Sequence, residues 1–272
     1  MAMDQAGGDQ EFVFVAKLHN VRNFSNVLRA VHFKDQAAFC ATANGIKVTV
    51  EDSKCMQANA FIQAGIFHEY HVKSDSVTFR INLTALLGCL TIFGSSSQNG
   101  ATAMKMCYRG DGHPLVALLE EGGVLTDCKI KTQEMEDALP FDFCHTDVVN
   151  KVIMKSEGLR EAFGELDMSS DFLEIMMSPD KPFFRLSTFG SSGSVHCDYP
   201  KDSDMMELFS CAKAQSNRYR VNLLKPSTKA LALSCKVSIR TDPRGLLSLQ
   251  FMLRTEDGQI CFVEFYCCPD EE

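Results

Sequence analysis

The chain has 272 residues and a formal net charge of −8, because 35 acidic residues outnumber 27 Lys and Arg residues. This net charge excludes a nucleic-acid binder whose whole surface is basic. It is compatible with a protein whose basic residues are gathered on one face. The 45% hydrophobic content is typical of a folded protein, and the length suits two domains of average size. The polar, acidic start and the short apolar runs predict neither a secretory signal nor a membrane span.

The twelve cysteines have no C-x-x-C spacing, and without a signal peptide they indicate a reducing compartment. The adjacent Cys267 and Cys268 could bind a metal, but we interpret them as small apolar residues of a strand. We therefore expect no metal and no cofactor.

The first half of the chain predicts strands and two helices after a disordered tail at residues 1–10. Val21, Phe24, Leu28 and Val31 recur at helical spacing. Strands with a turn follow in "FCATANGIKVTVED", and "FRINL" (79–83) ends a strand and opens a helix, with Asn82 as its cap and Gly94 as its stop. Further strands meet at glycine turns at 109–112 and 120–123.

The segment from Ile130 to Phe143 is polar and acidic and then becomes apolar, which predicts a connector at 131–140 with an anchored apolar end. An acidic surface loop accounts equally well for its first residues.

The second half repeats the plan of the first. The segment 148–155 is ambiguous between strand and helix, and "SEGLREAFGELD" has helical spacing. Strands follow in "LEIMMSPDKPFFRLSTFG", and then "YRVNL" (219–223) opens a helix that we expect to run through "VNLLKPSTKALAL". Turns at 241–245 and 256–258 separate the last strands. The near-identical phrases "FRINL" and "YRVNL" therefore indicate a duplicated domain, covering 11–130 and 141–272.

Several longer phrases resemble a known family. "INLTALL", "STKALALS" and the aromatic–proline–acidic end resemble the eukaryotic sliding DNA clamps, the proliferating cell nuclear antigen family. "VRNFSNVLRAVHF", "NGIKVTVED", "QANAFIQAGIF", "SEGLREAF" and "FYCCPDEE" are similar to the Rad-one family of subunits of the heterotrimeric nine-one-one checkpoint clamp. The resemblance covers the whole chain. It implies an α+β fold with two tandem copies of the DNA-clamp (processivity fold) domain, with helices on one face of antiparallel sheets.

In that family the helices line the hole of the ring, so the resemblance implies that the basic residues of these helices face DNA. The implied DNA-facing residues are Arg22, Asn26, Arg29, His32, Lys155, Arg160, Lys225 and Lys229. A solvated helix face is the alternative for each helix. The chain departs from the family in its second helix, which carries no charge, and in its third, which is more acidic than basic.

The resemblance also implies two surfaces for partners. Edge strands would pair with the neighbouring subunits through Val124, Leu125, Thr126, Cys128, Ile130, Val195, His196, Cys197 and Tyr199. A pocket for client peptides would include Val50, Met56, Leu139, Phe141, Met252, Phe262 and Tyr266. Ordinary edge strands and a plain hydrophobic core are the alternatives.

The function implied by the resemblance is that of a non-catalytic subunit of a ring around DNA. Its expected partners are two other clamp subunits, the backbone of duplex DNA, an ATP-dependent clamp loader and client proteins of checkpoint signalling and repair, with no membrane. We expect nuclear residence. The rival hypothesis is a 3'-5' DNA exonuclease, but the acidic residues occur in turns and at the end of the chain, where solvated loops explain them.

Overall fold

The computed structural model describes residues 12–93, 101–134, 141, 143, 146–191, 193–255 and 258–270. The predicted tail at 1–10, Gly94 and residues 135–140 of the predicted connector, with Leu139, lie outside the described residues. The chain forms two compact units. One comprises Met1–Val50, Asn59–Leu139 and Thr255–Cys261, and the other comprises Glu51–Ala58, Pro140–Arg254 and Phe262–Glu272. Each unit thus takes a short segment from the other half of the sequence.

The first half of the chain contains ten strands, two α-helices and one 3-10 helix among its described residues. They are β1 (Phe14–Leu18), α1 (Arg22–Val31), β2 (Gln36–Thr42), β3 (Gly45–Asp52), β4 (Met56–Gln63), η3 (Ala64–Ile66), β5 (Glu69–Val72), β6 (Ser76–Asn82), α2 (Leu83–Leu90), β7 (Ala103–Tyr108), β8 (Leu115–Glu121), β9 (Val124–Ile130) and β10 (Thr132–Gln133).

The second half has the same order of elements, except that η3 and β10 have no described counterpart and that its last helical segment is divided. Its elements are β11 (Asn150–Lys155), α3 (Ser156–Glu165), β12 (Phe172–Met177), β13 (Phe184–Gly190), β14 (Gly193–Tyr199), β15 (Met206–Cys211), β16 (Gln215–Arg220), α4 (Val221–Leu224), η4 (Lys225–Ser227), α5 (Thr228–Leu233), β17 (Ser234–Thr241), β18 (Leu247–Arg254) and β19 (Ile260–Cys267). The ambiguous segment before α3 is therefore a strand.

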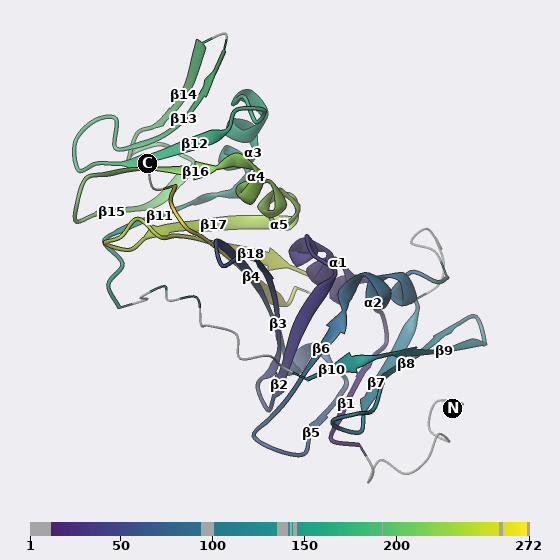
Figure 1. Cartoon of the computed structure of the whole chain (residues 1–272). Coiled ribbons are helices and arrows are strands. Elements are labelled where there is room, and N and C mark those ends of the chain that lie inside the picture. The colour runs from purple at the N-terminus through teal and green to yellow at the C-terminus, as the bar shows by residue number, and fades with distance from the viewer. Residues whose placement is uncertain are drawn as a thin grey trace. The chain divides into compact units, whose positions relative to one another are not determined.

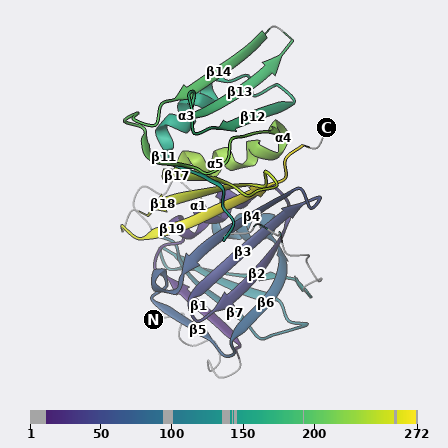
Figure 2. The ribbon, with the colours of Figure 1, turned by 90° about the vertical axis from the view of Figure 1, so that its left-hand side faces the viewer.

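The pairing of the strands is duplicated. The first repeat has the orders β5-β1-β7-β8-β9 and β6-β2-β3-β4, and the second has β15-β11-β17-β18-β19 and β16-β12-β13-β14. All registers that the structure gives are antiparallel. Within the first unit α1 packs against α2, and within the second α3 packs against α5, each pair on one face of the strands (Figures 1 and 2). The α+β architecture with two copies of one topology, expected from the sequence, is confirmed.

The repeated phrase marks equivalent positions of the two cores. Phe79 is fully buried on β6, and its ring centroid lies 5.5 Å from that of Phe39 and 4.6 Å from that of Tyr108. Its counterpart Tyr219 is also fully buried, on β16, and its hydroxyl donates a hydrogen bond of 2.7 Å to the carbonyl of Gly245. Each phrase therefore anchors the strand that leads into a helix with a large aromatic ring.

The helices that follow the two phrases differ. Asn82 caps α2 as predicted, because its Oδ1 accepts a hydrogen bond of 2.8 Å from the backbone N–H of Ala85. The prediction that this helix continues to Gly94 was wrong, since α2 ends at Leu90 and the Thr91 hydroxyl donates to the carbonyl of Leu87. A side chain that bonds a carbonyl of the last turn competes with further helical bonds.

The expected continuous helix over 221–233 is also corrected. Pro226 has no N–H, and its ring would clash with the carbonyl four residues earlier, so a regular α-helix cannot pass through it. The chain instead forms the short α4, the 3-10 turn η4 and then α5. The hydroxyls of Ser227 and Thr228 each donate a 2.7 Å hydrogen bond to carbonyls of the broken turn.

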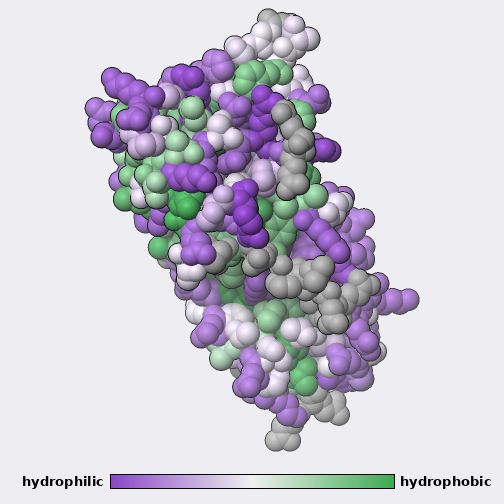
Figure 3. Space-filling view, turned by 60° about the vertical axis from the view of Figure 1, so that its left-hand side comes forward, coloured by the Kyte–Doolittle hydropathy of each residue, from purple (hydrophilic) through white to green (hydrophobic). Residues whose placement is uncertain are grey.

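No helix among the described residues is long and apolar enough to cross a membrane. On the face shown in Figure 3, hydrophilic residues surround small groups of apolar ones.

Replacing Gly45 with alanine should destabilise the protein by about 2–4 kcal/mol, because Gly45 has a φ of +138° and an added Cβ would lie 2.1 Å from the carbonyl oxygen of Ile62. Urea unfolding of the purified chain measures the change. Gly65→Ala is the matched control, since an added Cβ there meets no atom within 4 Å, and its unfolding midpoint should stay close to that of the wild type. Equal midpoints for both variants would contradict the close approach.

Candidate functional site

The α1 helix presents a basic face. Phe24, Leu28 and Val31 are buried against the unit, whereas Arg22 is exposed and Arg29 is half-buried. The helix contains no acidic residue, and Arg29 lies in its last turn, where a positive charge is favourable to the helix dipole. The predicted Asn26 is half-buried on the same helix. Because α1 itself carries no carboxylate, its basic face can attract a phosphate backbone.

His32, the fourth predicted residue of this face, joins α1 to α2. Its Nε2 lies 2.8 Å from the Thr84 hydroxyl, which in turn donates a 2.6 Å hydrogen bond to the Asp35 carboxylate. Because a threonine hydroxyl has one proton, Nε2 of His32 must be the donor to Thr84. The role of His32 is thus first to hold the start of α2 against the end of α1. The exposed positions of α2 itself, which include Thr84, Ala85 and Gly88, carry no charge.

The helices of the second unit have a mixed surface. Lys155, at the N-cap of α3, is exposed, but so are Glu157, Glu161 and Glu165 of that helix. Arg160 is engaged elsewhere, because its Nη1 donates hydrogen bonds of 3.1 Å and 3.2 Å to the carbonyls of Leu231 and Ser234. It therefore satisfies carbonyls at the end of α5, and its contact with DNA stays a prediction.

Lys225 and Lys229 are both exposed, on η4 and α5 respectively. Although they are four residues apart, they do not share one helix face, because the break at Pro226 puts them on different helical elements. Each remains a separate exposed cation on the helical side of the second unit.

The two strands predicted to bind neighbouring subunits both lie at sheet edges. Among the strands that the structure describes, β9 pairs only with β8, and β14 pairs only with β13. Val124 and Leu125 of β9 are 58% and 51% exposed, and Val195 of β14 is 39% exposed. An exposed edge with large apolar side chains is a site where another strand can add.

Not all of the predicted interface residues are accessible on these strands. His196 is exposed, and Thr126, Cys128 and Cys197 are half-buried. The prediction that Ile130 contacts a neighbouring subunit was wrong. Its side chain is buried at the end of β9, where the alternation of side chains along the strand turns it inward. Tyr199 is half-buried, and its hydroxyl donates a 2.7 Å hydrogen bond to the Gly158 carbonyl of α3.

The predicted peptide pocket is only partly assembled from the residues named for it. Phe141 stacks on Tyr266 with ring centroids 5.8 Å apart, and both join a cluster with Phe143 and Leu246. Met252 and Phe262 are half-buried on β18 and β19. The predictions for Val50, Met56 and Tyr266 were wrong, because their side chains are buried and offer little surface to a peptide. Phe143, on which the Arg240 guanidinium packs at 5.6 Å, was not singled out from the sequence.

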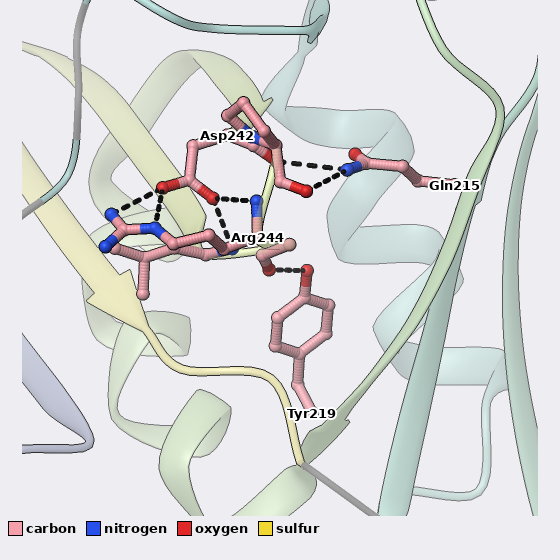
Figure 4. Close-up of polar contacts among 7 residues, drawn as sticks. Gln215, Tyr219, Asp242 and Arg244 are labelled. Carbon is pink, nitrogen blue, oxygen red and sulfur yellow. Dashed lines mark hydrogen bonds and ion pairs between the residues drawn. The ribbon is translucent and has the colours of Figure 1, made fainter.

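A polar network that the sequence analysis did not find supports this part of the second unit. The Asp242 carboxylate is fully buried and accepts hydrogen bonds from the backbone N–H groups of Arg244 and Leu246 and from the Arg244 guanidinium. The Gln215 side-chain amide donates to the carbonyls of Asp242 and Pro243 (Figure 4). The sequence "TDPRG" could have indicated this turn, because an Asp side chain commonly accepts a hydrogen bond from the backbone N–H two residues later.

Among the described residues, no group of three or more His, Cys, Asp or Glu residues could hold a metal ion.

Comparison with known proteins gives one consistent result. The family model described as "Repair protein Rad1/Rec1/Rad17" matches residues 13–253. The chain is 68% identical to the human "Cell cycle checkpoint protein RAD1" over 265 residues, which are 97% of this chain and 94% of that protein. It is 67% identical to the mouse protein of that name over 264 residues, with the same coverage. A more distant match is the "DNA repair exonuclease REC1" of Mycosarcoma maydis, 25% identical over 79% of this chain and 71% of that protein.

The five tyrosines of the chain should not titrate near pH 10 while it stays folded. Burial raises the pKa of Tyr199 to about 12 and also raises those of Tyr70, Tyr108, Tyr219 and Tyr266. The folded state therefore favours the neutral phenols, so their contribution to stability is present below about pH 10 and is lost as the pH rises above it. Tyrosinate absorbance should rise together with the loss of circular dichroism, whereas the urea-unfolded chain should titrate at about pH 10. Ionisation centred there in a chain that stays folded would contradict the burial.

Proposed function

Because the chain belongs to the Rad1/Rec1/Rad17 family of repair proteins, we propose that it acts in the DNA damage checkpoint and in DNA repair as a non-catalytic subunit of a ring-shaped sliding clamp. The fold is that of this family, with two tandem copies of the DNA-clamp domain. The names of the human and mouse relatives support the checkpoint role, and the family description supports the repair role. The ring is heterotrimeric, with two other clamp subunits as partners.

The observation that carries this proposal is the pair of edge strands β9 and β14, one in each repeat. Both leave backbone groups and apolar side chains at a sheet edge. They belong to different repeats and have different side chains, so their contacts with neighbours are heterologous. Heterologous contacts close into a ring when the rotation between subunits closes.

The charges of the helices support contact with duplex DNA through its backbone. The α1 face supplies Arg22 and Arg29 without an acidic residue, and the second unit adds Lys155, Lys225 and Lys229. The exposed carboxylates of α3 weaken this surface in the second unit. We propose that the first unit makes the stronger contact, which is independent of base sequence and suits sliding.

The remaining parts of the proposal concern partners and place. A closed ring has to be opened for DNA to enter, so we propose an ATP-dependent clamp loader as a further partner. Checkpoint and repair proteins are the proposed clients, with the half-buried Phe141, Met252 and Phe262 as one contact for their peptides. We propose the nucleus as its location, because its proposed ligand is chromosomal DNA.

Replacing Leu125 with glutamate should weaken assembly with the two other clamp subunits by about tenfold or more, because a charge would be buried without a partner where β9 meets a neighbouring strand. Val195→Glu should act in the same way at β14. Sedimentation of co-expressed subunits measures the fraction in the trimer. The matched control is Leu208→Glu on β15, a 41% exposed leucine on an edge strand outside the proposed interface. Normal trimer in both edge variants would overturn the assignment.

Changing Arg22, Arg29 and Lys229 together to glutamate should shorten the retention of the loaded ring on circular duplex DNA. It should also reduce the dependence of that retention on salt, since fewer phosphates are neutralised. The control variant replaces Lys47, Lys73 and Lys213, which are exposed on strands and turns, with glutamate. Its net charge therefore changes by the same amount. Trimer assembly is measured first, so that a loss of DNA contact is separated from a loss of the ring. Unchanged retention at every salt concentration would argue against a DNA-facing role for these helices.

The second candidate, a 3'-5' exonuclease, is favoured only by the name of the fungal relative. That activity would appear as metal-dependent release of nucleotides from a DNA end, and it would disappear in carboxylate variants. Release that persists through every such variant belongs to a contaminant.

A further inference from the structure

Two cysteines that are far apart in the sequence, Cys55 and Cys268, are neighbours within the second unit. The backbone N–H of Cys268 donates a 2.9 Å hydrogen bond to the Cys55 carbonyl. The Cys268 sulfur lies 3.7 Å from the carbonyl oxygen of Lys54, beside the peptide bond that joins Lys54 to Cys55. A backbone hydrogen bond between opposite residues of a sheet brings their Cα atoms to about 5.5 Å, and a disulfide can bridge about 4.4–6.8 Å.

Cys55 is held in place by a tight turn. Ser53 and Lys54 have φ angles of 51° and 58°, and the backbone N–H of Cys55 donates a 3.0 Å hydrogen bond to the Asp52 carbonyl. A two-residue turn with positive φ at both positions matches the twist of a hairpin. Cys55 follows this turn and is exposed, so an oxidant in the solvent can reach its thiol.

Cys268 is held from its other side as well. Its side chain is half-buried and packs against the cluster of Phe143, Leu246 and Tyr266. Two residues later, the backbone N–H of Asp270 donates a 2.7 Å hydrogen bond to the Arg218 carbonyl. Both cysteines are therefore positioned before any bond forms between them, which lowers the entropy cost of joining them.

The adjacent Cys267 is a poor partner for Cys55. Its side chain is buried, and burial raises the pKa of its thiol, with a further increase from the nearby Cys268 and Cys55. The thiolate is the reactive form of cysteine, so Cys267 is disfavoured as a nucleophile. Successive side chains of an extended chain also point in opposite directions, so Cys267 and Cys268 do not present their sulfurs to the same side.

A positive charge lies near the exposed thiol. The pKa of Arg220 is raised first by its hydrogen bond to Asp270 and then by the charges of Asp270 and Cys55. The Arg220 guanidinium, which Asp270 shares at 2.7 Å, is therefore within electrostatic reach of Cys55. An accessible cysteine near a cation, with a second cysteine beside it, is the arrangement found in redox-sensitive thiol pairs.

We propose that Cys55 and Cys268 form a reversible redox site, whose substrate is a hydroperoxide and whose oxidised form is a disulfide between the two residues. In a reducing compartment such disulfides are transient and act as redox sensors, so cysteines that are reduced in the structure are compatible with this role. The site does not depend on a ring or on DNA, because all of its residues belong to one chain.

The reaction has two steps. The thiolate sulfur of Cys55 attacks one oxygen of hydrogen peroxide, the O–O bond breaks, and hydroxide leaves, so that Cys55 becomes a sulfenic acid. The sulfur of Cys268 then attacks the Cys55 sulfur, an S–S bond forms, and the S–O bond breaks with loss of water. The two sulfurs together lose two electrons, and the peroxide takes up these electrons and the two thiol protons to become two waters. A thiol such as glutathione reverses the disulfide through a mixed disulfide.

The disulfide would close a long loop of the chain. Cys55 lies in the segment Glu51–Ala58, which the first half of the sequence contributes to the second unit. A bond from this segment to Cys268 restricts the unfolded chain, and so it should raise the resistance of the second unit to unfolding.

The test exposes the reduced, purified chain to hydrogen peroxide, blocks the remaining thiols with N-ethylmaleimide and identifies linked tryptic peptides by mass spectrometry. We expect the peptide that begins at Cys55 to be linked to the C-terminal peptide within monomeric chains, and dithiothreitol should separate them. The yield should fall by about tenfold or more in Cys55→Ser and in Cys268→Ser, because each variant lacks one of the two sulfurs. The matched control is Cys235→Ser, which removes an exposed thiol on β17 and should leave the yield unchanged.

Thermal unfolding followed by circular dichroism gives a second measurement. The midpoint of the wild type should rise by several degrees after oxidation and return with dithiothreitol, whereas that of Cys55→Ser should not change. A linked peptide that persists in Cys268→Ser would assign the bond to Cys267 and overturn the proposal. Disulfides found only between chains, or oxidation of Cys55 to a sulfinic acid without any linked peptide, would overturn it as well. Urea unfolding under reducing conditions shows that each variant is folded before it is oxidised.

Discussion

The structure depends on one constraint, which is that backbone N–H and C=O groups along a strand need hydrogen-bond partners on both of its edges. Inside the sheets the neighbouring strands meet this need. At the outer strands the chain meets it in different ways. The edge of β6 is paired with β10, and the Arg218 carbonyl of β16 accepts a backbone hydrogen bond from Asp270. On β9 and β14 the open edge coincides with exposed apolar side chains, so these strands are suited to meet other chains.

Duplication explains why β6 and β16 form equivalent edges of the two repeats. Both repeats pair their strands in the same order and place an aromatic ring of the repeated phrase in the core. They then diverge where the helix after that phrase begins. Asn82 caps an uninterrupted α2, whereas Pro226 divides the counterpart into three short pieces. The polar turn at Asp242 is a further specialisation, in which a buried carboxylate accepts four hydrogen bonds from Arg244 and Leu246 of the same turn.

The sequence predicted those parts of the fold that follow from local spacing. The apolar period placed α1 and α3, and paired glycines placed turns, such as Gly122 and Gly123, whose positive φ permits the two-residue hairpin between β8 and β9. Local spacing could not show contacts made across the fold. The bond of His32 to Thr84 and that of Arg160 to Leu231 join residues far apart in the sequence. The burial of Val50 and Met56 likewise depends on which face of a strand meets the core, and a family position alone does not give that.

The chemistry of the basic face on α1 has one more consequence. Its charged side chains are both arginines, and the helix contains no lysine. A guanidinium stays protonated at any physiological pH, and acetyl transfer to lysine amines leaves it unchanged. Acetylation can therefore neutralise Lys225 or Lys229 in the second unit, while the charge of α1 persists.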